Sequence, residues 1–278
     1  MIGVITLFYV EKNTNFGKHH NLPTTNNQLM CNYMGFKVSK EQNLRLKDLE
    51  KEYGADIVFK ALQNGFEYGD WGIVKANAAI NDIEIINAHW EFIPPWIKNT
   101  EALKAARKQG IPWLNATAEK LLESKMFRDA ALNRRCLVPM SWFYEWRHIH
   151  INNAKKATTF PYIISLPAKE YFYAAGIYQP WTDKETGEII NTFAIITTKA
   201  NPFMEQVHNV KKRMPAILTE ELAYEWIMKD ISETRVQEII NTALDSAALD
   251  AYPIQKEFRV LENPTVEFEY AELPALVK

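Results

Sequence analysis

Residues 134–146 have the sequence RRCLVPMSWFYEW, and the part from Cys136 to Met140 predicts a buried β-strand. It is a short apolar run, which is typical of a strand that is covered on both faces. Further strands are predicted at Tyr162–Ser165, Tyr171–Ile177 and Phe193–Thr197, with a polar turn at Thr182–Gly187. Several strands with few helices among them predict an α+β fold, a single domain with a curled mixed β-sheet or barrel-like core and peripheral helices.

Local patterns predict further elements outside this core. Ser39 and Gln42 form a capping-box pattern, which predicts a helix that ends near Gly54. The aromatic segment Trp90–Trp96 contains two prolines, and we expect a loop there. The remaining predictions are two helices capped by Thr219 and Ser232, a short helix at Thr117–Met126 and a final strand at Thr265–Tyr270.

The composition narrows the function classes. The chain has 278 residues, of which 47% are hydrophobic, enough for a sizeable core. The formal net charge of −2 gives no general attraction to nucleic acid, so such binding needs a local basic patch. Cys31 and Cys136 form no disulfide framework and fit a reducing cytoplasm, where we expect a monomer. No apolar run is long enough to cross a membrane. We expect no cofactor and no metal, because glycines are few and His148 and His150 lack further ligands.

The first thirty residues differ from the rest of the chain. Residues 1–10 are apolar but have no basic flank, which does not fit a secretory signal. Residues 12–27 are polar and show no periodicity. We therefore expect residues 1–29 to be a disordered extension or a mis-assigned start, with the folded domain at residues 30–278.

Cys31 follows Met30 directly and has a chemistry of its own if the preceding residues are removed. It then carries a thiol and a free α-amine on adjacent carbons. The amine, with a pKa of about 8, is partly neutral at neutral pH, and the thiol is the stronger nucleophile once it is ionised. Together they can capture an aldehyde as an imine and close a five-membered thiazolidine, which an internal cysteine cannot do.

Three later segments contain candidate catalytic residues. Asn115 follows a Trp-Leu pair, and Glu145 lies among four aromatic residues of SWFYEW. Burial among rings raises the pKa of a carboxyl group toward the range of a general acid or base. His208 leads into the cationic run of HNVKKRMP. From the residues alone, Glu145 has the alternative of a rim or turn glutamate, His208 that of a structural or solvated histidine, and the basic run that of a solvated face. Asn115 by itself indicates no function. Cys136 is expected to be a small buried hydrophobic residue.

The order of these segments resembles the abasic-site-processing family, also called the SOS-response-associated peptidase family. Its members begin Met-Cys and then carry an Asn-Ala-Arg-like element, a Trp/Gly-Phe-x-Glu-Trp element and a His-x-x-x-x-Arg-Met-Pro element. The matching segments here are Met30-Cys31, Asn115-Ala116-Thr117, Trp142–Trp146 and His208–Pro215, supported by 134–139, 174–178 and 197–202. The resemblance extends from Met30 to about Tyr270, which is nearly the whole expected domain.

The resemblance implies that the chain binds single-stranded DNA and traps the ring-opened aldehyde of an abasic site. Cys31 is then the covalent residue, and Glu145 is the general acid/base. Asn115 positions the amine or the sugar, and His208 assists ring opening. The implied DNA-binding residues are Trp96, Thr197, Lys211, Lys212 and Arg213. The implied enzyme activity is abasic-site crosslinking, of lyase type, with cysteine-dependent self-removal of the residues before Cys31.

The chain departs from the family pattern at several positions. Tyr33 and Thr117 stand where the family has arginines that are expected to hold phosphates. Glu91 replaces a glycine and adds a negative charge. Lys104, Arg107 and Lys108, in an insertion-like stretch at 99–110, are expected to offset that charge.

Two other functions stay open at this point. One is a cysteine hydrolase in which Cys31 and His208 act as nucleophile and base on peptides in trans. The other is a non-catalytic single-stranded-DNA-binding module that keeps the fold without crosslinking.

Overall fold

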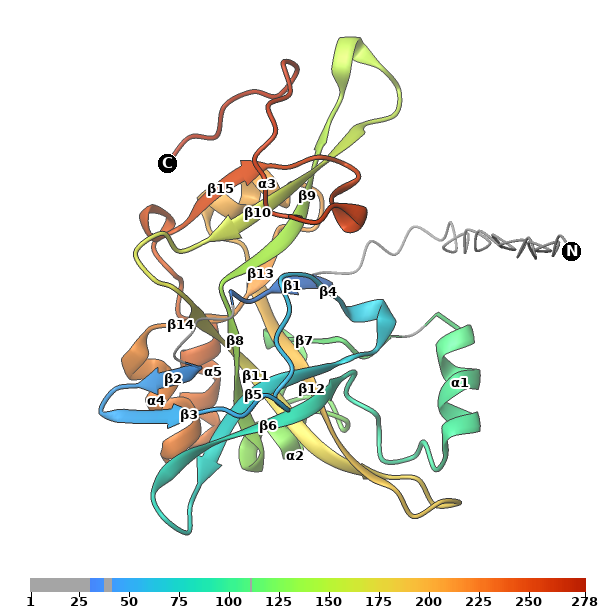
Figure 1. The fold of residues 1–278 in the computed structure, drawn as a ribbon, viewed down its shortest axis with the longest axis vertical. Helices are drawn as coiled ribbons and strands as arrows, with labels where there is room; N and C mark the ends of the chain where they lie inside the picture. The colour runs from blue at the N-terminus through green and yellow to red at the C-terminus, as the bar shows by residue number, and fades with distance from the viewer. Residues whose placement is uncertain (1–30, 38–41, 111) are drawn as a thin grey trace, which may run out of the picture.

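The computed structural model describes residues 31–37, 42–110 and 112–278, which form an α+β fold with two main sheets (Figure 1). The strands of the larger sheet are β5 (Asp70–Asn77), β6 (Asp82–Trp90), β7 (Asn115–Thr117), β8 (Arg135–Met140), β11 (Phe172–Thr182), β12 (Ile189–Lys199), β13 (Arg213–Pro215) and β14 (Ile217–Leu218). The pairings β12–β6, β6–β5, β5–β8, β8–β11 and β11–β12 close a circuit. In this circuit β12 and β6 run parallel and the other pairs antiparallel. The expected barrel-like mixed core is therefore confirmed.

The second sheet is antiparallel and has the order β15-β10-β9-β1-β4. Its strands are β1 (Tyr33–Gly35), β4 (Gln63–Asn64), β9 (Trp142–Ile149), β10 (Thr158–Ser165) and β15 (Asp250–Pro253). Only Ser141 separates β8 of the first sheet from β9 of the second. The segment RRCLVPMSWFYEW therefore passes from one sheet into the other, and it carries Glu145 into the second.

The core is rich in tryptophan, and its indole groups are hydrogen-bonded. Trp71, Trp90 and Trp226 have no exposed surface. Their Nε1–H groups donate to the carbonyl oxygens of Pro139 at 3.0 Å, Leu114 at 3.1 Å and Cys136 at 3.0 Å. These bonds offset the cost of burying a polar group among apolar neighbours. Cys136 itself is fully buried, as predicted.

The helix predicted before Gly54 is wrong. The described part of this stretch is a hairpin of β2 (Asn43–Leu46) and β3 (Leu49–Glu52), and residues 38–41 lie outside the described residues. Leu44 and Leu46 are both buried, whereas the residue between them is exposed. A spacing of two residues is the period of a strand, so this alternation overrides the capping pattern.

Two further local predictions are wrong. The expected helix at Thr117–Met126 contains only the 3-10 turn η2 (Ala118–Lys120), because the preceding residues are paired with β12 as β7. The expected strand at Thr265–Tyr270 forms one isolated bridge, between Ile254 and Glu267. The other 3-10 turns are η1 (Gly65–Glu67), η3 (Ile151–Asn153), η4 (Ser246–Ala248) and η5 (Phe258–Val260).

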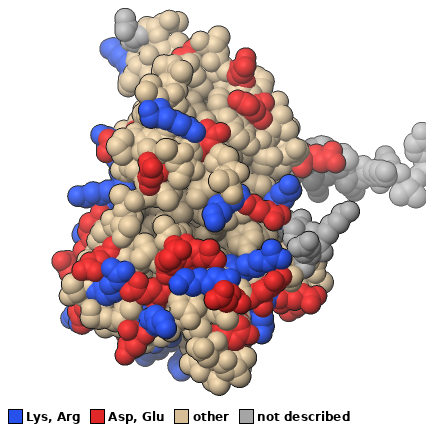
Figure 2. Space-filling model, turned by 90° about the vertical axis from the view of Figure 1, so that its left-hand side faces the viewer, with Lys and Arg blue, Asp and Glu red and all other residues tan. Residues whose placement is uncertain are grey.

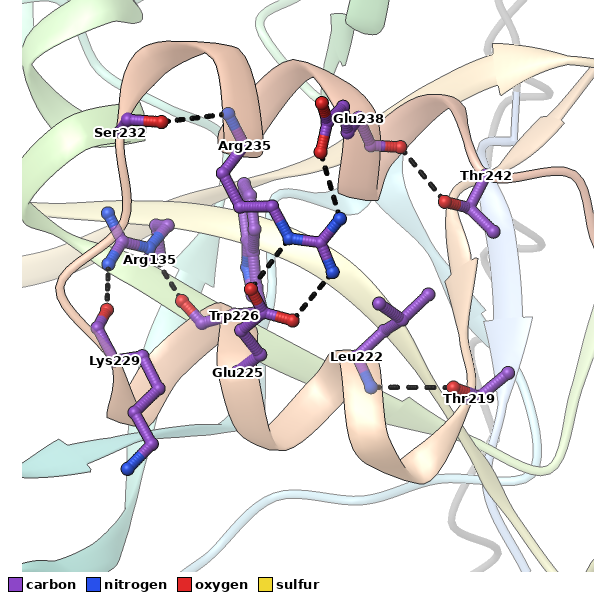
Figure 3. A network of polar contacts seen from close by, with 10 residues as sticks. All are labelled: Arg135, Thr219, Leu222, Glu225, Trp226, Lys229, Ser232, Arg235, Glu238 and Thr242. Atoms are coloured by element: carbon purple, nitrogen blue, oxygen red, sulfur yellow. Dashed lines mark hydrogen bonds and ion pairs between the residues drawn. The ribbon is translucent and has the colours of Figure 1, made fainter.

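The helices lie outside the barrel. They are α1 (Thr100–Lys108), α2 (Arg128–Asn133), α3 (Pro202–Val207), α4 (Glu220–Met228) and α5 (Glu233–Asn241). The predicted caps of α4 and α5 are confirmed, because Thr219 accepts from the amide of Leu222 and Ser232 from that of Arg235 (Figure 3). Each bond satisfies one of the free N–H groups at a helix start.

Arg135 ties α4 to the barrel (Figure 3). From β8 it donates to the carbonyl oxygen of Trp226 at 2.5 Å and to that of Lys229 at 2.8 Å. These carbonyls lie at the C-terminal end of α4, where a cation is favourable. Arg135, which lies in the segment 134–139 that supports the family resemblance, thus fastens the end of this helix to β8.

No helix in the described part of the chain is long and apolar enough to cross a membrane. The expected extension at residues 1–29 lies outside the described residues and stays a prediction.

Candidate functional site

Cys31 and Glu145 meet where β1 begins beside β9. Glu145 is on β9, and the register pairs its neighbour Tyr144 with Tyr33 of β1. The main-chain nitrogen of Cys31 donates to Oε1 of Glu145 at 2.9 Å. Cys31 is 1% exposed and Glu145 2% exposed. The atom that becomes the α-amine of an N-terminal cysteine is thus already bonded to a buried carboxyl group.

His208 approaches the same carboxyl group from the end of α3. Its Nδ1 lies 2.9 Å from the carbonyl oxygen of Arg213, which can only accept, so Nδ1 carries the proton in the neutral ring. Nε2 then faces Oε2 of Glu145 at 3.7 Å. Burial lowers the pKa of His208, so the neutral form is favoured. The pair can pass a proton between them after a small movement.

Burial also sets the protonation of Cys31 and Glu145. It raises the pKa of Glu145 to about 8, although the hydrogen bond from Cys31 opposes the shift. Within the described residues, no lysine or arginine lies within ion-pair distance of this carboxyl group. Burial, with the charge of Glu145, raises the pKa of the Cys31 thiol well above its usual value. The resting site therefore holds a neutral thiol beside a carboxyl group that is mostly protonated at neutral pH.

Asn115 completes the group. It starts β7, which runs parallel to β12 with Asn115 beside Ile195. Its Nδ2 lies 3.4 Å from the carbonyl oxygen of Cys31 and 3.4 Å from Oδ1 of Asn32. The structure thus brings Cys31, Asn115 and Glu145 together with His208, from four separate segments of the chain. Their catalytic roles stay predictions.

Asn209 was not predicted, and it positions His208. Its Oδ1 accepts from the amide of His148 at 3.0 Å, and its Nδ2 donates to the carbonyl oxygen of His148 at 2.7 Å. His148 is on β9, three residues after Glu145. This two-bond clamp fastens the loop of His208 to the strand of Glu145. Apart from the place of Asn209 next to His208, no sequence pattern predicts this clamp, because its partner His148 is far away in the chain.

The predicted basic run is mostly engaged in internal ion pairs. Arg213 makes two bonds to the Glu119 carboxylate, at 2.5 and 2.9 Å, and a third to the carbonyl oxygen of Thr197. Lys212 is exposed and pairs with Glu205 at 2.9 Å. Lys211 is exposed, and the structure describes no carboxylate partner for it. On the face shown in Figure 2, basic and acidic side chains are interspersed, so no extended positive patch covers that face.

The other two predicted DNA contacts have opposite exposures. Trp96 is 56% exposed, on the loop between β6 and α1. That loop is fixed on the barrel, because Trp181 donates to the carbonyl oxygen of Ile97 at 2.6 Å. Thr197 has no exposed surface. The burial of Thr197 does not fit a direct contact with DNA. The side chain of Trp96, in contrast, is accessible on the surface of the protein.

Glu91 adds no free negative charge to the site. It is fully buried, and its Oε2 accepts two bonds from the Arg107 guanidinium, at 2.5 and 2.9 Å. Arg107 also lies over the ring of Tyr68, at 3.9 Å from its centroid. The expected compensation by Arg107 is therefore an internal ion pair that docks α1 on β6. Lys104 is paired with Glu101 of the same helix.

The alternative nucleophile–base pair is not formed. In the part of the chain that the structure describes, the thiol of Cys31 makes no hydrogen bond to His208, whose ring nitrogens face Glu145 and the carbonyl oxygen of Arg213. The sequence predicts no metal site at His148 and His150. Among the described residues no three His, Cys, Asp or Glu side chains are placed to hold a metal ion.

Comparison with known proteins adds relatives and a family. Abasic site processing protein YoqW of Bacillus subtilis is 34% identical over 178 residues, which cover 64% of this chain and 72% of that protein. Abasic site processing protein HMCES of Gallus gallus is 24% identical over 208 residues, covering 70% of this chain and 59% of that protein.

Solved structures agree with the fold. A Bacteroides thetaiotaomicron protein superposes with a TM-score of 0.64 and 31% identity, covering 76% of this chain and 84% of that one. A Bordetella bronchiseptica protein of 18% identity has a TM-score of 0.63 and shares the fold. Residues 14–260 match the sequence profile of the family described as SOS response associated peptidase. Because this match covers most of the chain, the chain belongs to the SOS response associated peptidase (SRAP) family.

Proposed function

We propose that this protein senses abasic sites in single-stranded DNA and crosslinks to them through Cys31 after the preceding residues have been removed. The observation that carries the proposal is the 2.9 Å bond from the Cys31 nitrogen to the buried Glu145 carboxyl group. The bond places the Glu145 carboxyl group, which can donate and accept a proton, next to the Cys31 nitrogen that must attack the aldehyde. The names of the relatives, which are abasic site processing proteins, support the choice of substrate.

The chemistry begins with the amine. The neutral α-amine of Cys31 adds to the aldehyde carbon of the ring-opened sugar and forms a carbinolamine. Glu145, largely protonated because burial raises its pKa to about 8, donates a proton as the hydroxyl group leaves as water. The product is an iminium ion, whose nitrogen keeps its own proton, and its carbon then accepts the Cys31 sulfur. The thiol proton passes to the Glu145 carboxylate and restores its protonated form, and the thiazolidine closes with a neutral N–H.

The order of the two bonds follows from the pKa directions. The thiol is neutral at rest, because burial raises its pKa well above the usual value. A neutral thiol is a poor nucleophile, so the amine reacts first. Loss of the Glu145 proton during dehydration then leaves a carboxylate that can take up the thiol proton. His208 is the second proton carrier, at 3.7 Å from Oε2, and Asn115 holds the main chain of Cys31.

The same contact fits the self-processing step that we propose. The Cys31 sulfur attacks the carbonyl carbon of Met30, and the Cys31 nitrogen leaves as an amine that is protonated by Glu145. Water then hydrolyses the thioester. Cys31 has a φ of 42°, in the left-handed region that costs an ordinary residue about 1 to 2 kcal/mol. An N-terminal residue has no such restraint, so cleavage releases this strain.

A DNA strand would be held by Trp96 and Lys211. Trp96 offers a ring on which a base can stack, and Lys211 a charge for phosphate. Lys212 and Arg213 would have to exchange their carboxylate partners for phosphate. Because of this exchange, Lys212 and Arg213 should contribute less to DNA affinity than their charges suggest.

The test is adduct formation by protein whose N-terminus has been established by intact-mass measurement. Protein that begins at Cys31 should form a heat-stable adduct with single-stranded DNA containing one abasic site, and none with the undamaged strand. Cys31→Ala should abolish the adduct, and Cys31→Ser should prevent the thiazolidine because a hydroxyl is a far poorer nucleophile. Absence of an adduct at low salt, with a verified Cys31 terminus, would replace crosslinking by simple DNA binding.

A further inference from the structure

The arginines of the described residues differ sharply in whether their charge is neutralised. Six lie within ion-pair distance of a carboxylate: Arg45, Arg107, Arg128, Arg134, Arg213 and Arg235. Arg135 and Arg147 are bound to carbonyl oxygens of the main chain. Arg259 is exposed, and no carboxylate in the described chain lies within 4.0 Å of it. It therefore keeps a full charge that is available to an anion.

Arg259 lies beside the start of β1. It belongs to η5, and its Nη1 donates to the hydroxyl of Tyr33 at 3.3 Å. Tyr33 is two residues from Cys31 and faces Tyr144, which precedes Glu145. In Figure 1 the C-terminal segment runs beside β9 and β10, above β1. Arg259 thus places its guanidinium next to the first residue of β1, two residues after Cys31.

Aromatic rings hold this guanidinium in place without neutralising it. The ring of Phe258 lies 5.8 Å from the Arg259 guanidinium carbon and stacks on Tyr144 with a centroid distance of 5.1 Å. The Tyr33 ring is 5.1 Å from that of Trp146, edge to face. Trp146 is half-buried and follows Glu145 directly. Phe258, Tyr33 and Tyr144 are buried, so these rings hold the exposed guanidinium at the surface, where its charge can meet a phosphate of single-stranded DNA.

We propose that Arg259, with the Tyr33 hydroxyl, binds a backbone phosphate of the DNA strand next to the reacting abasic site. This inference rests on the proposed function. Tyr33 stands where the SRAP resemblance led us to expect a phosphate-binding arginine. A tyrosine carries no charge, but its hydroxyl accepts a bond from the Arg259 guanidinium at 3.3 Å. The charge is supplied from the C-terminal segment instead.

Noncovalent binding tests Arg259 separately from crosslinking. The probe is fluorescein-labelled single-stranded DNA with a tetrahydrofuran abasic analogue, which has no aldehyde, and anisotropy is measured over a series of salt concentrations with the full native protein. Arg259→Ala should raise Kd roughly five- to tenfold at low salt and reduce the slope of log Kd against log salt by about 0.7, the value for one phosphate on a single strand. Lys184→Ala, which removes an exposed charge in the β11–β12 turn, is the matched control and should leave Kd within about twofold.

A second-site variant makes the assignment specific. In the Arg259→Ala background, Tyr33→Arg should restore the salt slope, because it returns a guanidinium to the same place from β1. In the adduct assay with true abasic DNA, Arg259→Ala should raise the half-saturating DNA concentration and leave the limiting rate unchanged. An Arg259→Ala slope equal to wild type, or equal losses in Arg259→Ala and Lys184→Ala, would overturn the proposal. If the tetrahydrofuran strand shows the expected loss but true abasic DNA gives no adduct, the crosslinking function fails while the phosphate contact stands.

Discussion

Two buried glutamates in this molecule have opposite surroundings. Glu91 is fully buried and Glu145 is 2% exposed, and burial raises the pKa of both. Glu91 is bound by the Arg107 guanidinium, which opposes the rise and favours the carboxylate. Glu145 faces a main-chain nitrogen and a neutral histidine instead. Burial with a cation makes a structural ion pair, whereas burial without one makes a carboxyl group that can exchange a proton near neutral pH.

The largest expected effect is on the reaction. Glu145→Gln keeps the shape of the side chain but cannot exchange a proton, so the adduct should form roughly a hundredfold or more slowly. Glu91→Gln removes an equally buried carboxylate and should change the rate by less than about threefold, since it does not touch the reacting atoms. Single-turnover kinetics on abasic single-stranded DNA measures both. Equal losses in the two variants would mean that Glu145 has no special role.

The Glu91–Arg107 ion pair is expected to affect stability. Arg107→Ala leaves the Glu91 carboxylate buried and unpaired and should reduce the free energy of unfolding by about 2 kcal/mol, less than for a fully enclosed pair because Arg107 is partly exposed. The matched control on the same helix is Lys104→Ala, whose ion pair with Glu101 is exposed and should contribute less than about 0.5 kcal/mol. Urea denaturation measures the free energy of unfolding of both variants. Indistinguishable midpoints for the two variants would contradict a structural role for the Glu91–Arg107 pair.

The stability of the folded protein should depend on pH because the pKa of Glu145 is raised. Its pKa is raised from 4.5 to about 8, so between these values the folded state holds a proton that the unfolded state has lost. Stability from this group is present below pH 4.5 and is lost as the pH rises toward 8. Glu145→Gln, which resembles the protonated acid, should therefore gain stability relative to wild type as the pH increases from 5 to 8. A difference between the two proteins that does not change over this range would argue against the raised pKa.

The smallest effect concerns the clamp that joins His208 to the strand of Glu145. Asn209→Ala removes two bonds to the His148 main chain and should slow adduct formation roughly three- to tenfold, because His208 then samples positions farther from the carboxyl group. Asn209→Asp keeps the acceptor for the His148 amide and should lose less of the rate. The half-saturating DNA concentration should not change in either variant. A change in that concentration alone would make Asn209 a DNA contact.

Local patterns predicted the parts of the fold that depend on neighbouring residues. The strand at Cys136–Met140 and the caps Thr219 and Ser232 are determined by their immediate sequence. The closure of the barrel was predicted only as a class, because the parallel pairing of β12 with β6 joins residues about a hundred positions apart. The hairpin at Asn43–Glu52 was missed since a capping pattern was preferred to the alternation of Leu44 and Leu46.

The candidate site also contains residues that the local sequence indicates and residues whose partners are distant in the chain. Residues with a chemical signature, such as Cys31 behind Met30 and Glu145 among aromatic residues, were recognised as candidates from the sequence. Asn209 and Arg259 act through partners that only the fold supplies, His148 for one and Tyr33 for the other. The ion pair of Glu91 was anticipated in charge but not in geometry, because α1 had to fold back on β6 to form it.

The central claim is that the carboxyl group of Glu145 exchanges its proton near neutral pH. Carbon-13 NMR of side-chain carboxyl groups measures this directly, with the Glu145 resonance assigned as the one that disappears in Glu145→Gln. We expect its titration midpoint to be about 8. A midpoint near the ordinary 4.5 of a glutamate would contradict the account, because Glu145 would then be a carboxylate at rest, with no proton to give to the Cys31 reaction.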